Sequence, residues 1–110
     1  KAIPHDQINN ILKKFKFIVI PSKSEVFPLV YFEALKANVI PLVNNIDFFN
    51  IVSGKYKDHI FDINKYETFN KVFLWAKNLD NNTYKSYILS LKKEFVKYYK
   101  VHRKSIDTLS

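Results

Sequence analysis

The sequence predicts an α/β domain in which a parallel β-sheet is flanked by helices. Three short segments rich in β-branched and aromatic residues have the length of buried strands: 15–20, 39–43 and 59–62. Segments with helical spacing of apolar residues lie between and after them. Because strands that alternate with helices are joined by right-handed crossovers, we expect parallel strands with helices on both faces of the sheet.

The first half of the chain is expected to alternate between helix and strand. Apolar residues at helical spacing predict a helix over 6–14, and Pro21 ends the strand that follows. Pro28 suits the first turn of the next helix, because the N–H that proline lacks would be unpaired there, and Asn38 is expected to close that helix. In the second strand, Pro41 is tolerable only near an edge or where its missing N–H faces no partner.

The second half is expected to be mainly helical. A short helix is predicted over 47–52 and a turn over 54–58. The next helix has one apolar face, made of Tyr66, Phe69, Phe73 and Ala76. The pair Asn81 and Asn82 is interpreted as a break. The last helix has an apolar face made of Tyr84, Tyr87, Ile88, Leu91, Phe95 and Tyr98.

Length and composition limit the classes of protein that fit. A chain of 110 residues with 47% apolar residues is long enough for one modest domain. It has no cysteine, which excludes disulfides and thiolate metal sites, and His5, His59 and His102 lack ligand spacing, so no metal site is expected. No apolar run reaches the roughly 20 residues of a spanning helix, so a cytoplasmic location is expected. The chain begins at Lys1 and lacks methionine, and we interpret it as part of a longer protein.

The formal charge of +8 has two interpretations. It indicates either an anionic partner, such as a nucleotide, nucleic acid or acidic lipid, or only a lysine-rich background. Several lysines fall on the outer side of the last helix: Lys85, Lys92, Lys93, Lys97 and Lys100. Solvated helices and interfacial helices share this pattern. We favour the solvated face and leave peripheral contact with the inner face of a membrane open.

The stretch SEVFPLVYFEALKANVIP, residues 24–41, holds two carboxylates in apolar surroundings. Removing an ionised carboxylate from water costs several kcal/mol unless a polar group meets it. Glu25 lies on a loop, where it is suited to sugar hydroxyls. Glu33 lies in the predicted helix, where it is suited to accept both hydrogen bonds of a ribose diol. Both carboxylates are therefore suited to meet the hydroxyl groups of a bound ligand.

The predicted topology supports that site. Ligands of open parallel sheets bind beyond the carboxyl ends of the strands, where the loop over 21–27 is expected. The first-turn N–H groups of Leu29 and Val30 would face the same crevice, and a helix N-terminus suits the charge of a diphosphate. Ser22 is suited either to touch phosphate or to cap a turn, and the turn is the favoured interpretation.

The same residues resemble a known family. The order Pro21-Ser22, Glu25, Phe27-Pro28, then EAL at 33–35 and NVIPLV at 38–43, is similar to the nucleotide-sugar-binding part of the retaining GT-B glycosyltransferases (glycosyl transferases group 1, family 4-like). That group includes glycogen synthases, sucrose synthases and bacterial polysaccharide mannosyl- and glucosyltransferases. The resemblance covers 5–79. The chain departs from the family pattern at Val26, at Asn38 and over 44–52, which lacks the usual paired glycines.

The resemblance implies a carboxyl-terminal, Rossmann-like domain of a two-domain hexosyltransferase, with 80–110 as terminal helices. It implies that Glu25 lies by the donor sugar, that Glu33 binds the ribose, and that the N–H groups just after Pro28 hold the phosphates. The donor would be a UDP- or GDP-linked sugar, with no metal in the catalytic centre and no further cofactor.

The resemblance also implies what the chain does not contain. A glycan or lipid-linked acceptor, as in polysaccharide biosynthesis, would be bound by an amino-terminal domain. The Arg and Lys that neutralise the diphosphate would lie upstream as well. The isolated chain is therefore expected to transfer no sugar.

Two other functions fit the residues less well. A non-catalytic basic α/β module that docks nucleic acid or a protein partner would leave the two glutamates incidental. The segment KKEFVKYYKVHRK, residues 92–104, interleaves bases and aromatics as single-strand binders do, but it also fits one amphipathic helix, and we expect no nucleic acid. Hydrolysis by paired carboxylates requires a defined separation across the substrate bond, which the sequence spacing does not establish.

Overall fold

The computed structural model describes residues 16–24 and 29–109, and side chains up to residue 100. Within these ranges β1 (Phe17–Ile20), β2 (Ile40–Asn44) and β3 (Ile60–Phe61) form a sheet in the order β1-β2-β3. Both strand pairs are parallel. The predicted α/β class and parallel sheet are thereby confirmed. The helix predicted over 6–14 lies outside the described residues, as do Glu25, Val26, Phe27 and Pro28.

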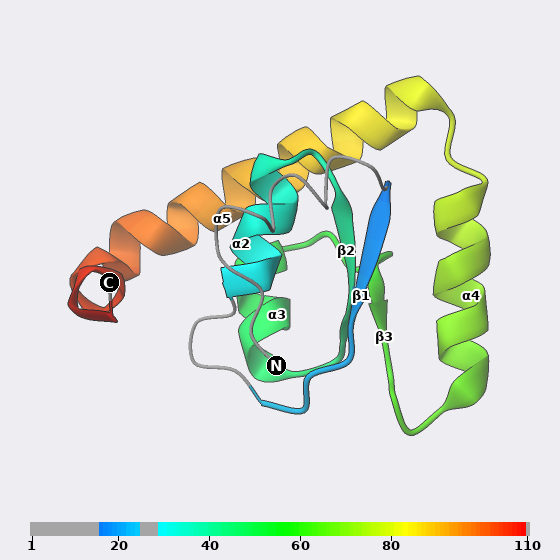
Figure 1. Cartoon of the computed structure of the whole chain (residues 1–110), viewed down its shortest axis with the longest axis horizontal. Helices are drawn as coiled ribbons and strands as arrows, with labels where there is room; N and C mark the ends of the chain where they lie inside the picture. The colour runs from blue at the N-terminus through cyan, green and yellow to red at the C-terminus, as the bar shows by residue number, and fades with distance from the viewer. Residues whose placement is uncertain (1–15, 25–28, 110) are drawn as a thin grey trace.

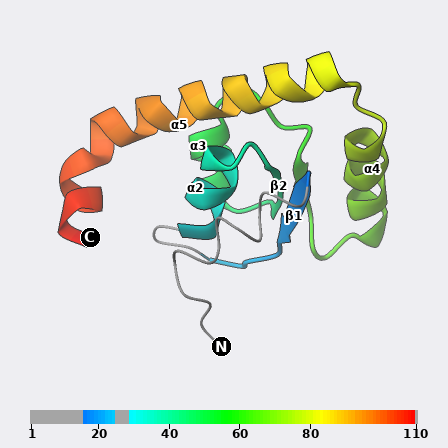
Figure 2. The ribbon, with the colours of Figure 1, turned by 45° about the horizontal axis from the view of Figure 1, so that its top comes forward.

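Helices cover both faces of the sheet and one of its ends (Figures 1 and 2). α2 (Leu29–Lys36) and α3 (Asp47–Ser53) lie on one face, and α4 (Tyr66–Lys77) lies on the other. α5 (Asn81–Leu109) crosses the end at which the strands begin. This arrangement leaves the carboxyl ends of the strands at the opposite edge.

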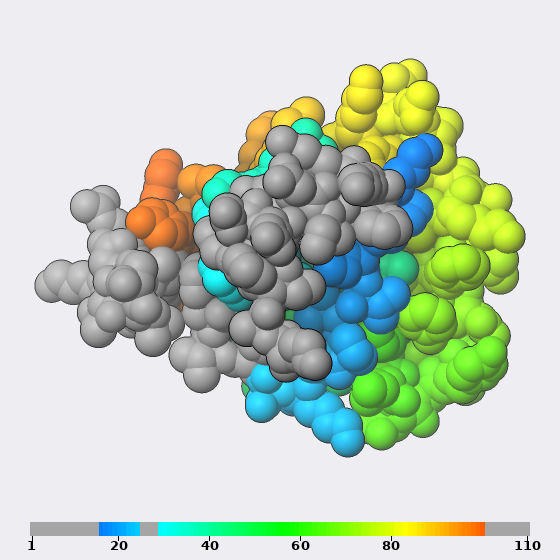
Figure 3. Space-filling view, viewed as in Figure 1, coloured from blue at the N-terminus to red at the C-terminus, as the bar shows by residue number. Residues whose placement is uncertain are grey.

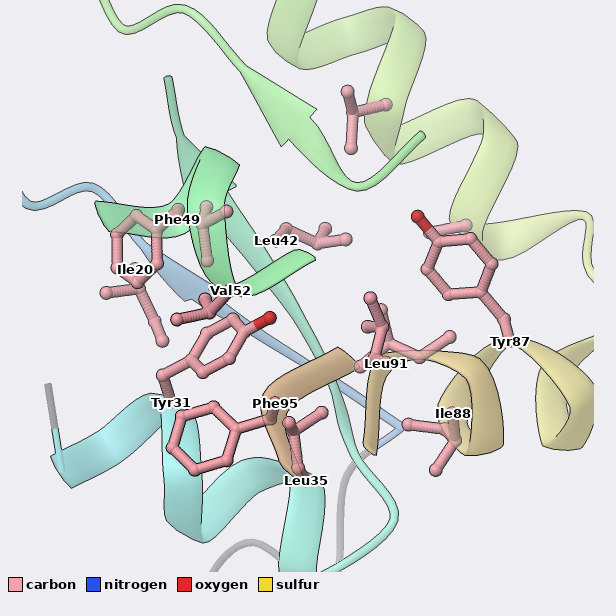
Figure 4. Packing of buried hydrophobic residues seen from close by; sticks show 14 of the residues in the cluster. Ile20, Tyr31, Leu35, Leu42, Phe49, Val52, Tyr87, Ile88, Leu91 and Phe95 are labelled. Carbon is pink, nitrogen blue, oxygen red and sulfur yellow. The ribbon is translucent and has the colours of Figure 1, made fainter. Parts of the chain in front are cut away.

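A buried aromatic and aliphatic core joins α2, α3 and α5 to the sheet (Figure 4). Tyr31 and Leu35 of α2 face Phe95 of α5, and the rings of Tyr31 and Phe49 lie 5.3 Å apart. Burial of each large apolar side chain contributes about 1.5–3 kcal/mol. The predicted apolar face of the last helix is confirmed, since Tyr87, Ile88, Leu91 and Phe95 are buried, and Tyr84 and Tyr98 are partly buried against them.

The connection from α2 to β2 depends on an asparagine with left-handed backbone. Asn38 has a φ of 62°, and the next residue, Val39, donates its N–H to the Ala34 carbonyl at 2.8 Å. Asparagine tolerates this conformation better than most residues, which explains why it can close a helix in place of glycine. The predicted helix end is confirmed.

Pro41 lies in the central strand, yet it interrupts no hydrogen bond of the sheet. The N–H of Ile40 points to β1, where it meets the Lys16 carbonyl, and that of Val43 points to β3, where it meets the His59 carbonyl. Because N–H directions alternate along a strand, position 41 faces the β3 side. There it precedes the first β2–β3 pair, Val43 with Ile60. The missing N–H therefore removes no bond between the strands.

The interpretation of Asn81 and Asn82 as a break is wrong, because both lie in the first turn of α5. The boundary is set by Asp80, whose Oδ1 accepts the Thr83 N–H at 2.8 Å. This is the bond of an N-cap residue, and it lowers the pKa of the Asp80 carboxyl. The asparagines follow the cap rather than separating two helices.

The apolar face predicted for α4 is wrong in two of its four members. Tyr66 is 75% exposed and Phe73 is exposed as well, whereas Val72 and Ala76 are buried. α4 contacts the sheet at β3, where the rings of Phe69 and Phe61 meet edge to face at 5.2 Å. The buried face is therefore centred on the row that includes Phe69, Val72 and Ala76, which places Tyr66 and Phe73 at its margin.

Candidate functional site

The three strands end at one edge of the sheet, and their following loops meet there. β1 ends at Ile20, β2 at Asn44 and β3 at Phe61. The loop after β1 lies at the lower edge of the molecule, beside residues from the region of β3 (Figure 3). In parallel α/β sheets this edge is where ligands bind. It is also the edge that α5 leaves uncovered (Figure 1).

Asn44 joins the loops on either side of the central strand. Its Nδ2 donates to the Ser22 carbonyl at 3.1 Å, and its Oδ1 accepts the Ile63 N–H at 2.9 Å. The side chain is buried, with 5% of its surface exposed. The sequence analysis ended the second strand at residue 43 and assigned no role to Asn44. The available signal was an amide, which can donate and accept at once, directly after a buried strand.

The predicted anion-binding residues lie at the same edge as far as the structure describes them. Leu29 and Val30 are the first residues of α2, and both are exposed. N–H groups of a first helical turn have no acceptor within the helix, and anion sites at helix N-termini use such groups. Ser22 contacts Asn44 through its carbonyl, and this contact does not use its hydroxyl. Glu25, the predicted sugar contact, lies outside the described residues.

Glu33 is buried on α2, with 1% of its surface exposed. Its Oε1 lies 3.8 Å from Nζ of Lys36, one turn further along the helix. That distance allows an electrostatic attraction but exceeds a hydrogen bond. The burial of Glu33 agrees with the apolar surroundings of this carboxylate in the sequence.

A hollow of about 470 Å³ lies beside the end of β3. Its lining includes Lys57, Lys65 and Asp62, with the amides of Asn45 and Asn50. Lys57 donates to the Asn50 carbonyl at 2.8 Å, and Asp62 Oδ1 accepts the Asn64 N–H at 2.9 Å. Backbone contacts thus engage two of its charged groups, and the remaining lining mixes polar side chains with Ile60 and Phe61, so that no charge of one sign is concentrated there.

Four buried side chains form a chain of hydrogen bonds in the core. The sequence analysis did not predict it. The Tyr31 hydroxyl lies 3.3 Å from Ser53 Oγ, which lies 2.9 Å from Nε2 of His59. Nδ1 of His59 lies 2.7 Å from the Tyr87 hydroxyl. The four side chains belong to α2, α3, the segment before β3, and α5.

Burial determines the protonation of this chain of groups. It lowers the pKa of His59 to about 3, with a smaller contribution from the charge of Lys57, and it raises the pKa of Tyr31 to about 12. At neutral pH the imidazole is therefore neutral, with one nitrogen donating and the other accepting. Ser53 and His59 are fully buried, so the Ser–His pair is closed to substrates and serves to satisfy polar groups in the core.

The part of the chain that the structure describes holds neither a metal-binding cluster nor a membrane-spanning helix. No group of three or more His, Asp or Glu side chains there is arranged to hold a metal ion. None of the helices described is both long enough and apolar enough to cross a membrane.

The fold is that of a partial Rossmann-like α/β domain, and the loops at the carboxyl ends of its strands form the candidate site. The family model of glycosyl transferases group 1 matches residues 1–94, which is most of the chain. The chain therefore belongs to the glycosyl transferases group 1, and the resemblance noted from its sequence is confirmed at the level of that family. Neither the comparison with curated proteins nor that with solved structures gave a match.

Proposed function

We propose that the full-length protein is a retaining glycosyltransferase and that this chain supplies its nucleotide-sugar-binding part. The donor would be a UDP- or GDP-linked sugar, and the acceptor a glycan or lipid-linked glycan held mainly by an amino-terminal domain. The observation that carries the proposal is Glu33, a carboxylate buried on α2 in a member of the glycosyl transferases group 1. A ribose diol would give that carboxylate two donors.

Each residue of the site would have a separate task. The N–H groups of Leu29 and Val30 would hold the diphosphate, assisted by Ser22, and the positive end of the α2 dipole would stabilise the leaving nucleotide. Glu33 would fix the ribose. Glu25 would contact the donor sugar and act near the transition state. The acceptor hydroxyl would attack from the face of the leaving group, whose phosphate would take its proton, so that the configuration is retained.

Binding of the free nucleotide to the full-length protein tests this proposal. UDP and GDP are titrated by calorimetry against the wild type, Glu33→Gln and Glu67→Gln. Glu33→Gln keeps the size of the side chain and removes its charge, so it should weaken binding by about 1–3 kcal/mol, the usual size of a hydrogen bond to a charged group. Glu67, an exposed glutamate in the first turn of α4, provides the control and should have no effect.

Two results would contradict the proposal. Failure of both nucleotides to bind the wild type would remove the donor site altogether. Equal binding by the wild type and Glu33→Gln would show that the ribose is held elsewhere.

A lipid-linked acceptor would bring the enzyme to a membrane surface, and α5 offers a basic surface for that contact. Lys93 and Lys97 border a hollow of about 440 Å³ together with Lys55 and Glu94, and Glu94 pairs with Lys97 at 3.3 Å. The three lysines exceed the single glutamate, and this excess of positive charge would favour a peripheral contact with anionic lipid in the cytoplasm, which would suit an enzyme that extends a lipid-linked glycan. Flotation of the full-length protein with anionic vesicles, compared with Lys93→Gln/Lys97→Gln, tests the contact. Equal flotation of both proteins would exclude this surface.

A further inference from the structure

Asn44 occupies the centre of the carboxyl edge, between the two outer strands. It is the last residue of β2, and β2 is the middle strand of the sheet. Its amide bonds Ser22 of the loop after β1 and Ile63 of the loop after β3. One buried side chain therefore sets the spacing of two loops that are 41 residues apart in the sequence (63 − 22).

We infer that Asn44 is a positioning residue of the donor site. It would act through Ser22, by holding the loop over 21–24 against the sheet while that loop leads toward the N-terminus of α2. A flexible loop would have to be ordered each time a donor binds, and this ordering costs affinity. The inference rests on the proposed function, because the donor is what the ordered loop would bind.

The amide matters because each of the two hydrogen bonds uses a different group of it. The NH₂ group donates to Ser22 and the oxygen accepts from Ile63. An aspartate in this position would keep an acceptor for Ile63, but its carboxylate would face the Ser22 carbonyl with no proton to donate. An alanine would lose both bonds. The two substitutions therefore separate the link to the β1 loop from the link to the β3 loop.

Ser53→Ala provides a matched control for loss of stability. Ser53 is fully buried and hydrogen-bonded, as Asn44 is, but it belongs to the core around Tyr31 and His59. Its loss should lower the unfolding temperature without altering the carboxyl edge. A change in nucleotide affinity that appears in the Asn44 variants and not in Ser53→Ala thus reports positioning rather than stability.

The experiment uses the full-length protein with UDP and GDP as probes. Asn44→Ala and Asn44→Asp should each bind the nucleotide roughly threefold to tenfold more weakly, as loss of about one neutral hydrogen bond predicts. The donor is then UDP-glucose or GDP-glucose, according to which free nucleotide binds. KM for this donor should rise in both Asn44 variants and stay unchanged in Ser53→Ala. Hydrogen exchange of the Ile63 amide should be faster in Asn44→Ala and nearly normal in Asn44→Asp.

The possible failures are distinguishable. If the wild type binds UDP or GDP and the Asn44 variants bind it equally well, the inference is overturned and the proposed function stands. If Ser53→Ala weakens binding as much as Asn44→Ala does, the effect belongs to stability and the inference is again overturned. If the wild type binds neither nucleotide, the proposed function fails and the positioning role fails with it.

Discussion

Nδ1 of His59 lies 2.7 Å from the hydroxyl of Tyr87, and His59 is fully buried. A histidine in this position is neutral in the folded protein, and its pKa is lowered from 6.5 to about 3. Unfolding returns the imidazole to water, where it can take up a proton. This difference couples the stability of the fold to pH.

The first prediction is that stability falls as the pH drops below about 6.5. Above that value His59 is neutral in both states, so its full contribution is present. Between about 6.5 and 3 the unfolded state binds the additional proton, and stability is lost progressively, by roughly 2 kcal/mol between pH 7.5 and pH 5. Urea unfolding at several pH values measures it. In His59→Gln the pH dependence over this window should be smaller, and identical slopes in both proteins would contradict the prediction.

The second prediction concerns the left-handed backbone of Asn38. Asn38→Ala should destabilise the protein by about 1–2 kcal/mol relative to Asn38→Gly, because alanine adopts this conformation at a cost and glycine does not. Both variants lose the bond of 2.7 Å from Lys92 Nζ to Asn38 Oδ1, so their difference isolates the backbone term. Thermal unfolding compares the two. Equal midpoints would mean that the turn relaxes to another conformation.

The third prediction concerns Tyr84, at the edge of the sheet opposite the candidate site. Its hydroxyl donates to the carbonyls of Lys16 and Asn38, just before β1 and β2 begin. Tyr84→Phe should destabilise the protein by about 1 kcal/mol while nucleotide affinity stays unchanged. Tyr66→Phe, at a tyrosine that is 75% exposed, is the control for stability. A loss of nucleotide affinity in Tyr84→Phe would show that the two edges are coupled.

The fourth prediction separates the two glutamates of the sequence motif. If Glu25 contacts the sugar, Glu25→Gln in the full-length protein should lower kcat and the affinity for the intact donor, yet bind free UDP or GDP as the wild type does. Glu33→Gln should weaken the binding of the free nucleotide and of the nucleotide-sugar to a similar extent. Titration with the free nucleotide and then with the nucleotide-sugar distinguishes the two variants. Small, equal effects of both substitutions would refute the division of roles.

The fifth prediction is that the 110-residue chain alone transfers no sugar. In the proposed enzyme, the acceptor surface and the bases that neutralise the diphosphate belong to other parts of the protein. Product formation is followed with radiolabelled UDP- and GDP-glucose, and the full-length protein serves as the positive control. Turnover by the chain itself would contradict the proposed division of the active site.

The strands and the first described helix were predictable because their signals are local. β-branched runs next to prolines define β1 and β2, and Asn38 at the end of α2 carries its own conformational preference. The parallel order followed from the alternation of elements. Asn81 and Asn82 misled because asparagine suits both loops and first helical turns, and only the bond from Thr83 to Asp80 decides between them.

The candidate site was predictable only in part. Burial of Glu33 followed from its apolar neighbours, and the position of the first loop followed from the parallel strands. The contacts of Asn44 join residues 22 and 19 positions away, so no local pattern contains them. The same is true of His59 and Tyr87, which are 28 positions apart. Long-range pairs of this kind depend on how the elements pack.

The reach of Tyr84 also has a consequence for how the chain folds during synthesis. Its two carbonyl partners lie 68 and 46 residues earlier in the sequence. The first two strands therefore leave the ribosome well before the helix that covers their starting ends. Contacts of such long range form slowly, and unpaired strand ends are prone to aggregation in the meantime. The nascent sheet should depend on chaperones until α5 has emerged and docked.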